Sequence, residues 1–250
     1  APAEEAAAQE QVDEAAAPAV EEAVEAPAEE EAGGLVALHK TLKTKFIEGG
    51  AGFMALTLVT LVFGLALCIE RIIYLSLSKT NTKALLANVE AALKEGGIEK
   101  ALEVCRNTRG PVASIFYQGL SRYDEGIDVV EKTVASYGGV QLGLLEKNLS
   151  WISLFISIAP SLGFLGTIIG MIEAFDKIQQ VGDISATVVA GGIKVALLTT
   201  LLGLIIAIVL QLFYNYILSL IEGLVNEMED SSISLLDIVV EYDAAQNKKK

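Results

Sequence analysis

The stretch GFLGTIIGM, residues 163–171, lies inside an uncharged run of the chain yet carries three glycines and a threonine. Leucine would favour membrane insertion more strongly than glycine does, so the small residues need another explanation. The surrounding run, Asn148–Ile172, has 25 residues and no charged side chain. Because a helix needs about 20 residues to cross the hydrocarbon core of a bilayer, the stretch predicts a membrane-spanning helix with one narrow face.

Two further uncharged runs predict two more spans. Gly52–Ile69 has 18 residues and Val195–Ile221 has 27. Of the 250 residues of the chain, 52% are hydrophobic, which is more apolar than an ordinary soluble domain. The sequence has no alternating strand pattern and no internal repeat. The predicted fold class is therefore an all-α integral membrane protein with three transmembrane helices and long helices that extend into the cytoplasm.

The positions of Lys and Arg predict the orientation of the chain in the membrane. Nine of these residues lie in the segment 76–147 between the first and second spans, and three lysines end the chain. Lys177 and Lys194 are the basic residues between the second and third spans. Because basic segments stay on the cytoplasmic side, we expect a bacterial inner-membrane protein with a periplasmic N-terminus and a cytoplasmic C-terminus.

The order of segments follows from these spans. Residues 1–32 hold 11 acidic residues and no Lys or Arg, with few large apolar residues, which favours disorder. The missing first Met fits a removed signal peptide or a trimmed sequence. The expected segments are a periplasmic acidic Ala/Glu/Pro tail (1–34), an amphipathic interfacial helix (35–50), transmembrane helix 1 (51–75), a cytoplasmic helical domain (76–147), transmembrane helix 2 (148–174), a periplasmic turn (175–190), transmembrane helix 3 (191–221) and a cytoplasmic C-terminal helix and tail (222–250).

Apolar residues at helical spacing divide the cytoplasmic domain into several helices. Gly96-Gly97 ends the first of them, and Gly110-Pro111 ends the second. From Val129 onward the pattern predicts a long helix that leads directly into the second span.

Both of the later spans carry a face of small and weakly polar residues. At about 100° per residue, Pro160, Gly163 and Gly170 fall near Thr167 on the second span. On the third span the face around Thr200 is formed by Ala196, Gly203, Ala207 and Gln211. Small residues let helix backbones approach closely in a bilayer. This pattern fits plain helix packing, and it also fits a pore or a socket for another helix, with Thr167 and Thr200 as its polar lining.

Several chemistries have no sequence signal. There is no phosphate-binding GxxxxGK[ST] motif, no paired His/Cys ligand set and no plausible nucleophile with a base. We therefore expect no enzyme, no catalytic residue, no metal, no cofactor and no nucleic-acid partner. A proton relay inside a membrane usually needs a titratable side chain, and the three uncharged runs contain none. If protons cross here, the carboxylate must come from a partner; Glu173, Asp176 and Asp183 are candidates for admitting ions at the turn.

The segments 159–175, APSLGFLGTIIGMIEAF, and 192–215, GIKVALLTTLLGLIIAIVLQLFYN, resemble the MotA/TolQ/ExbB proton-channel family, and most of all its ExbB branch. The resemblance covers roughly residues 45–230. It implies a pentamer of this chain around a dimer of an ExbD-like single-span protein, whose Asp carries protons. It also implies that Thr167 and Thr200 line the pore. Proton motive force would then drive motion that a TonB-like protein passes to outer-membrane transporters.

One departure and several alternatives remain at this stage. Members of the family often have Glu five residues before the second pore threonine, where this chain has Val195 beside Lys194. We assign Lys194 no role in place of that Glu. A TolQ-like role in envelope maintenance and a motility motor share the same core, although MotA-type subunits have four spans. A membrane scaffold that conducts no ions would need the same helix packing.

Overall fold

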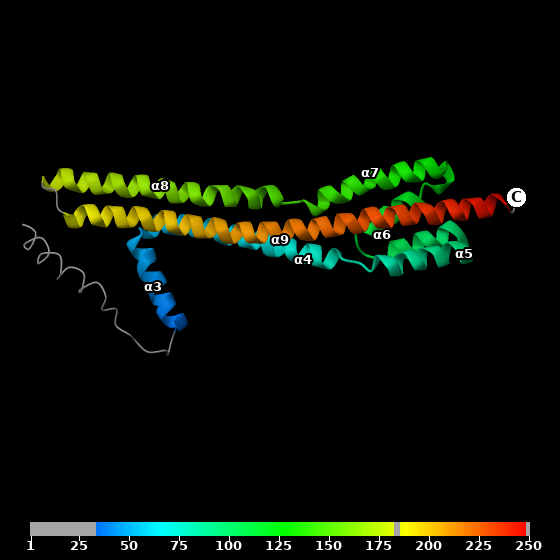
Figure 1. Ribbon diagram of the computed structural model, residues 1–250, viewed down its shortest axis with the longest axis horizontal. Coiled ribbons are helices and arrows are strands. Elements are labelled where there is room, and N and C mark those ends of the chain that lie inside the picture. The colour runs from blue at the N-terminus through cyan, green and yellow to red at the C-terminus, as the bar shows by residue number, and fades with distance from the viewer. Residues whose placement is uncertain (1–33, 183–185, 249–250) are drawn as a thin grey trace, which may run out of the picture. The chain divides into compact units, whose positions relative to one another are not determined.

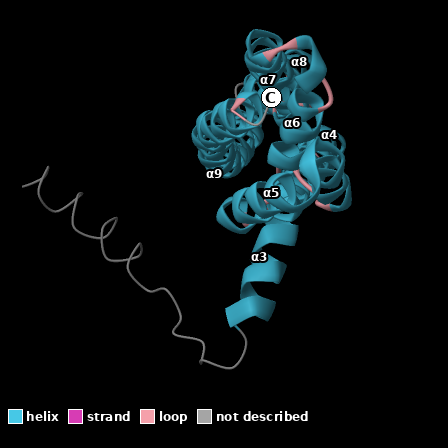
Figure 2. Cartoon of the chain, turned by 90° about the vertical axis from the view of Figure 1, so that its right-hand side faces the viewer, coloured by secondary structure: helices cyan, strands magenta, loops and turns pink. Residues whose placement is uncertain are grey.

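The computed structural model describes residues 34–182 and 186–248. Asp183, most of the acidic tail and part of the 175–190 turn lie outside the described residues. The chain forms two compact units, Ala1–Thr44 and Lys45–Lys250, and the second holds every helix from α4 onward. All regular elements of the described residues are helices (Figure 2). They are α3 (Gly34–Glu48), α4 (Ala51–Ser78), α5 (Thr82–Asn107), α6 (Pro111–Leu120), the 3₁₀ helix η1 (Tyr123–Glu125), α7 (Ile127–Leu145), α8 (Leu149–Val181) and α9 (Ala186–Asn247).

Three helical stretches are long and apolar enough to cross a membrane, and each contains one of the predicted spans. They lie in α4, in α8 and in the first part of α9, and α8 lies beside α9 (Figure 1). We call these stretches the apolar half of the second unit. Their outward surfaces carry exposed aromatic and aliphatic side chains such as Phe63, Phe164 and Ile208. Because such surfaces are stable against lipid tails and unfavourable against water, the chain is a membrane protein.

Helix α9 connects the two halves of the unit. Its 62 residues form one helix with a length of ~93 Å. No Pro occurs between Ala186 and Asn247, and its glycines lie inside the helix without breaking it. The predicted third span and the predicted C-terminal helix are therefore parts of one continuous helix.

The polar half consists of α5, α6, η1, α7 and the second part of α9 (Figure 1). Helix α5 is kinked at Gly97, where φ is 72°, and α6 starts with Pro111 directly after Gly110. Both breaks lie where the glycines predict them. The polar half has a core of large apolar side chains, including Val89, Phe116 and Leu235, all fully buried. This core ties α5, α6 and α7 to α9 and explains why the polar half folds as one body.

The prediction of one long helix from Val129 into the second span is wrong. Helix α7 ends at Leu145 and α8 begins at Leu149, and Asn148 between them is left-handed with φ 67°. Asn is one of the few residues other than Gly that adopt this conformation at modest cost. The break therefore depends on the backbone conformation of Asn148. Because this residue interrupts no apolar pattern, the periodicity of the sequence did not reveal the break.

Candidate functional site

The small residues of α8 and α9 bring the two helix backbones into direct contact. A Cβ atom added to Gly163 would lie 3.0 Å from the carbonyl oxygen of Thr199 and 3.0 Å from the Cα of Thr200. One added to Gly203 would lie 3.2 Å from the Cα of Gly163 and even closer to the carbonyl of Ala159. Since the atoms it would meet belong to backbones, neither glycine can be enlarged without moving a helix. The contact depends on missing side chains, as is typical in lipid.

The same contact continues along both helices. A Cβ on Gly170 would lie 3.2 Å from the backbone nitrogen of Ala196, and one on Gly166 would lie 2.6 Å from the Oγ1 of Thr199. Ala196 is 5% exposed. Gly163, Gly170, Ala196 and Gly203, all predicted to line a pore, are therefore buried between α8 and α9 of one chain.

Two neighbouring threonines supply the hydroxyls of this contact. Thr200 donates its hydroxyl to the carbonyl of Gly163 at 3.2 Å, across the two helices. Thr199 lies 2.8 Å from the carbonyl of Ala196 and 3.3 Å from that of Gly163. A hydroxyl has one hydrogen to donate, so the nearer Ala196 carbonyl is the main acceptor for Thr199. Thr200 therefore carries the polar bond between the two helices.

The remaining predicted residues lie at the margin of the contact. Thr167 is half-buried, and its hydroxyl donates to the carbonyl of Phe164 in its own helix at 2.6 Å. Pro160 and Ala207 are half-buried, and Gln211 is exposed and donates to Asn215 at 3.1 Å. These side chains, with half-buried Thr200, keep part of their surface free on the outside of the chain. The structure thus splits the predicted faces into a packed centre of glycines and a margin that carries the threonines.

The predicted ion-admitting residues lie around the end of α8. A cavity of about 210 Å³ between α8 and α9 is lined by Glu173 and Lys177 together with Gly170, Thr187 and Gly191. Asp176 is exposed and does not line this cavity. Asp183 lies outside the described residues. Of the two acids that the structure describes, Glu173 is the one placed at a hollow between the helices.

Lys194 forms an ion pair beside the start of α4. Its Nζ lies 2.9 Å from Oε1 of Glu48, and Lys45 lies 3.1 Å from Oε2 of the same carboxylate. Hydrogen bonds from Lys194 and then Lys45 lower the pKa of Glu48. Lys194 therefore points to Glu48, away from the contact between α8 and α9, and does not replace a glutamate there.

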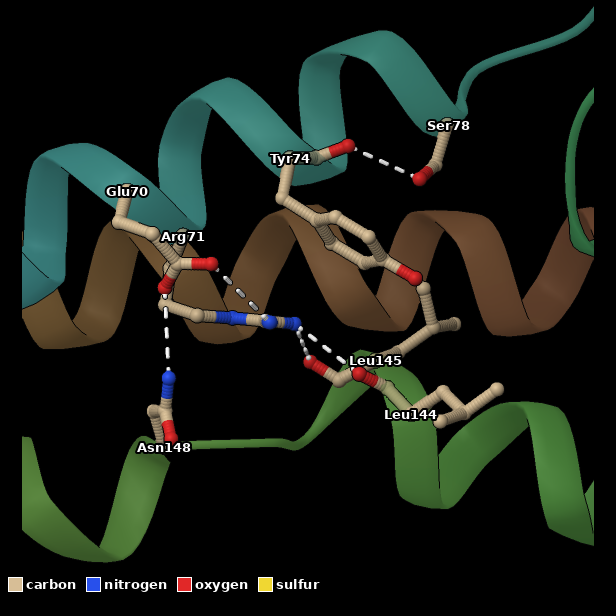
Figure 3. Close-up of polar contacts among 7 residues, drawn as sticks. All are labelled: Glu70, Arg71, Tyr74, Ser78, Leu144, Leu145 and Asn148. Atoms are coloured by element: carbon tan, nitrogen blue, oxygen red, sulfur yellow. Dashed lines mark hydrogen bonds and ion pairs between the residues drawn. The ribbon is translucent and has the colours of Figure 1, made fainter.

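A buried arginine joins α4 to the break between α7 and α8 (Figure 3). Arg71 is 1% exposed, and its Nη2 donates to the carbonyl oxygens of Leu144, at 3.2 Å, and Leu145. These are orphan carbonyls of the last turn of α7. The guanidinium also lies 4.6 Å from the ring centroid of Tyr74. The cation thus caps α7 and interacts favourably with the negative end of its helix dipole.

The same joint includes the residue that breaks the helix. Asn148 donates from Nδ2 to Oε2 of Glu70 at 3.4 Å, and Glu70 lies 3.9 Å from the Nη1 of Arg71 (Figure 3). Within the described residues, the Nε of Arg71 has no hydrogen-bond partner. We call Glu70, Arg71, Leu144, Leu145 and Asn148 the arginine joint. It fixes the first span to the corner where the chain enters the second span.

Sequence reasoning missed several polar residues that the structure buries. Thr57 and Thr60 of α4 are 0% and 7% exposed, and their hydroxyls donate to carbonyls of their own helix. Thr199 and Arg71 were also not predicted as contact residues. The adjacent pair Thr199-Thr200 was a usable signal, because two neighbouring hydroxyls at a helix contact reach different carbonyls. Nothing in the sequence indicates the partners of Arg71.

Comparisons with known proteins show which family shares this part of the sequence. Residues 107–230 match the model of the MotA/TolQ/ExbB proton channel family. A biopolymer transport ExbB homolog of Methanothermobacter thermautotrophicus is 30% identical over 67% of this chain. That match spans 60% of the length of the Methanothermobacter protein.

Two bacterial relatives extend the comparison. An ExbB-like biopolymer transport protein of Synechocystis is 30% identical over 64% of this chain, and the match covers 77% of that relative. The biopolymer transport protein ExbB of Pseudomonas putida is 37% identical over 33% of this chain and 25% of its own length. The family match includes all of α7, all of α8 and the membrane-spanning part of α9. The chain therefore belongs to the MotA/TolQ/ExbB proton channel family.

Proposed function

We propose that this protein is an ExbB-like stator subunit that conducts protons together with an ExbD-like single-span partner. The proposal rests on the polar side chains at the margin of the contact between α8 and α9. There Thr167 and Thr200 keep half-buried side chains beside a membrane contact that has no titratable group. Hydroxyls and ordered water can pass a proton, but a relay also needs a carboxylate. The partner's Asp supplies that carboxylate.

In this proposal the chain assembles as a homo-oligomer, by resemblance a pentamer, in the bacterial inner membrane. The N-terminus lies in the periplasm and the C-terminus in the cytoplasm. The arginine joint and the continuous α9 transmit motion between the apolar and polar halves. A TonB-like protein takes up the mechanical work for outer-membrane transport. Protons are the transported ion, and the chain acts as a transport subunit without cofactor or enzymatic chemistry.

A second function is favoured by a specific observation. The predicted glycines and Ala196 are packed inside one chain, and both threonines bond to carbonyls of that chain. A scaffold that conducts no ions would show the same bonds. A TolQ-like or motility motor, in contrast, would use the same pathway with another output.

The test is proton flux into proteoliposomes that hold this chain with a co-expressed single-span, Asp-bearing protein. Thr167→Val with Thr200→Val removes both margin hydroxyls with little change of shape. We expect flux to fall about tenfold or more, equivalent to ~1.4 kcal/mol per decade of rate. Thr57→Val in α4 is the matched control and should keep the flux.

Two outcomes separate the candidates. Thr200→Val also removes the hydrogen bond to Gly163. Thr200→Ser keeps a hydroxyl at this position, so if the hydroxyl is required, this variant should conduct protons where Thr200→Val does not. Full flux in the double variant would exclude the proton pathway and leave the scaffold. Native mass spectrometry of the same preparation should show the partner bound to an oligomer of this chain.

A further inference from the structure

Helix α9 carries an exposed stripe in the polar half that nothing in the described chain covers. This acidic stripe consists of Gly223, Asn226, Asp230, Ile233 and Asp237. At about 100° of rotation per residue, these five residues lie within ~50° of one direction around the helix axis. Ile233 is 62% exposed although it is a large aliphatic residue. The opposite side of the helix, with Met228 and Leu235, is buried in the core.

Helix α7 carries a second stripe with the opposite charge. Val140 is 54% exposed and Leu144 is 45% exposed. A shallow hollow of about 390 Å³ runs along this side and is lined by Lys132, Ser136, Tyr137 and Val140, among others. This basic stripe consists of Lys132, Ser136, Tyr137, Val140 and Leu144. It lies on a different side of α7 from the groove that α7 forms with α9 of the same chain.

The charges of both stripes are free to bind another molecule. Within the part of the chain that the structure describes, Lys132, Asp230 and Asp237 form no ion pair. Arg122, at the edge of the hollow, is different because it donates to both oxygens of Glu125 at 2.8 and 2.7 Å. Lys132 is therefore a cation of the basic stripe that has no ion-pair partner among the described residues.

The levels of the two stripes along the molecule can be compared. Helices α7 and α9 run in opposite directions (Figure 1) and enclose a groove of about 550 Å³. The lining runs from Glu131 to Leu142 on α7 and from Val225 to Leu236 on α9. Because the helices are antiparallel and both linings span the same number of residues, Glu131 is level with Leu236 and Leu142 is level with Val225.

Copies related by rotation about an axis along these helices keep every residue at its own level. The basic stripe of one copy then meets the acidic stripe of the next in register. Leu144 comes level with Gly223, where an added Cβ would have no neighbour within 4 Å. Tyr137 comes level with Asp230. Lys132 comes within two residues, ~3 Å, of Asp237, which its flexible side chain can bridge.

We propose that the basic stripe of α7 docks on the acidic stripe of α9 in a second copy of this chain. The central contacts are Leu144 in the gap at Gly223, Tyr137 at Asp230, and an ion pair between Lys132 and Asp237. Two acidic stripes would repel each other, so the contact joins different faces of the two copies. Repetition of such a head-to-tail contact closes a ring. The inference rests on the homo-oligomer of the proposed function but makes no use of proton transport.

Cysteine cross-linking of the full chain in its native membrane tests this contact. The variant Lys132→Cys with Asp237→Cys is treated with a short bifunctional thiol reagent and run on a denaturing gel. The natural cysteines, Cys68 and Cys105, are 0% and 2% exposed and do not compete for the reagent. We expect a ladder of covalent dimers and higher oligomers. Each single variant should remain monomeric because each copy would then offer only one side of the contact.

A matched control pairs Lys132→Cys with Glu99→Cys, which is exposed on α5 and belongs to neither stripe. That pair should give no ladder. Absence of a ladder from the Lys132–Asp237 pair would overturn the proposal. So would dimers formed by either single variant, or a cross-link to another protein through Asp237→Cys alone. The last result would identify a basic partner on the acidic stripe.

Charge reversal provides an independent readout. Lys132→Glu should lower the fraction of assembled oligomer at least several-fold in native mass spectrometry, and Asp237→Lys should do the same. The two changes together should restore assembly, because the pair is re-formed with exchanged signs. If the double variant assembles no better than the single ones, the pairing is wrong. Flux without a ladder would reject this contact alone, whereas a ladder without flux would reject the proposed function alone.

Discussion

The contact between α8 and α9 and the arginine joint hold the same helices by opposite means. In the contact, Gly163 and Gly203 let backbones touch, and Thr200 adds a single hydroxyl bond. In the joint, the long side chain of Arg71 is completely buried and donates to two carbonyls at the end of α7. Lipid offers no hydrophobic gain for large residues inside the membrane. A break in the helix, however, leaves carbonyls that need a donor.

The comparison teaches where this protein tolerates change. A contact made by missing side chains is sensitive to added volume and insensitive to charge. A joint made by one cation is sensitive to the loss of that cation and to little else. The following variants test the two kinds of connection against each other.

The largest effect is expected for Gly203→Ala. The new methyl group would meet the backbones of Ala159 and Gly163, which cannot yield as a side chain would. Overpacking of this kind costs up to about 3 kcal/mol. Thermal unfolding in detergent micelles should show a clear loss of stability.

Gly191→Ala is the control, since nothing lies within 4 Å of its Cβ position. This variant should be more stable than the wild type by up to about 1 kcal/mol, because Ala has a higher helix propensity than Gly. Equal midpoints for the two variants would contradict the close contact.

A smaller loss is expected for Arg71→Met, which keeps the length of the side chain but removes the donors. Leaving buried carbonyls without a donor costs about 2 kcal/mol. Because the joint is local, amide hydrogen exchange between residues 144 and 152 should speed up more than exchange elsewhere. Arg71→Lys should restore part of the protection, since an ammonium reaches one carbonyl where the guanidinium reaches two. Arg106→Met, at an exposed position of α5, should change nothing; unchanged exchange in Arg71→Met would refute the joint.

The sequence predicted the apolar half well because its signals are physical necessities. Each span must be long and uncharged, and Gly52–Ile69, Asn148–Ile172 and Val195–Ile221 all lie within long helices, with the exception of Asn148, which stands just before α8. The glycine faces were also visible as a pattern of small residues. Their direction was not, because the prediction centred each face on a threonine. The structure centres the contact on Gly163, Gly166 and Gly170 instead.

The polar connections could not be predicted, because they depend on residues far apart in the chain. Arg71 reaches carbonyls more than 70 positions away, and carbonyls leave no mark in a sequence. The break at Asn148 lacks the Gly or Pro that marked Gly97 and Gly110. The pore role of the margin residues stays a prediction, since it concerns surfaces that only an assembly would bring together.

The smallest effect is expected at the far end of α9, where the described residues show one side-chain hydrogen bond between α9 and the rest of the polar half. Tyr123 donates to Oδ1 of Asp243 at 2.8 Å. Burial, followed by this hydrogen bond, raises the pKa of Tyr123 to about 12. Tyr123→Phe should therefore cost about 1 kcal/mol near neutral pH. Tyr216→Phe, an exposed tyrosine of the same helix α9, should cost nothing.

The pH dependence of this bond gives a sharper test than its size. A tyrosine whose pKa is raised on folding stabilises the protein fully below its unfolded pKa of about 10. That contribution is lost as the pH rises from there through about 12. The difference in unfolding free energy between wild type and Tyr123→Phe should therefore be constant from pH 7 to 9 and shrink above pH 10. A difference that stays constant to pH 12 would contradict the raised pKa of Tyr123 on which this expectation rests. No difference at any pH would show that the ring, which Phe keeps, and not the hydroxyl bond to Asp243, holds this end of α9. The polar half would then rely on packing at this end, whereas the arginine joint connects its other end to the first span by polar contacts.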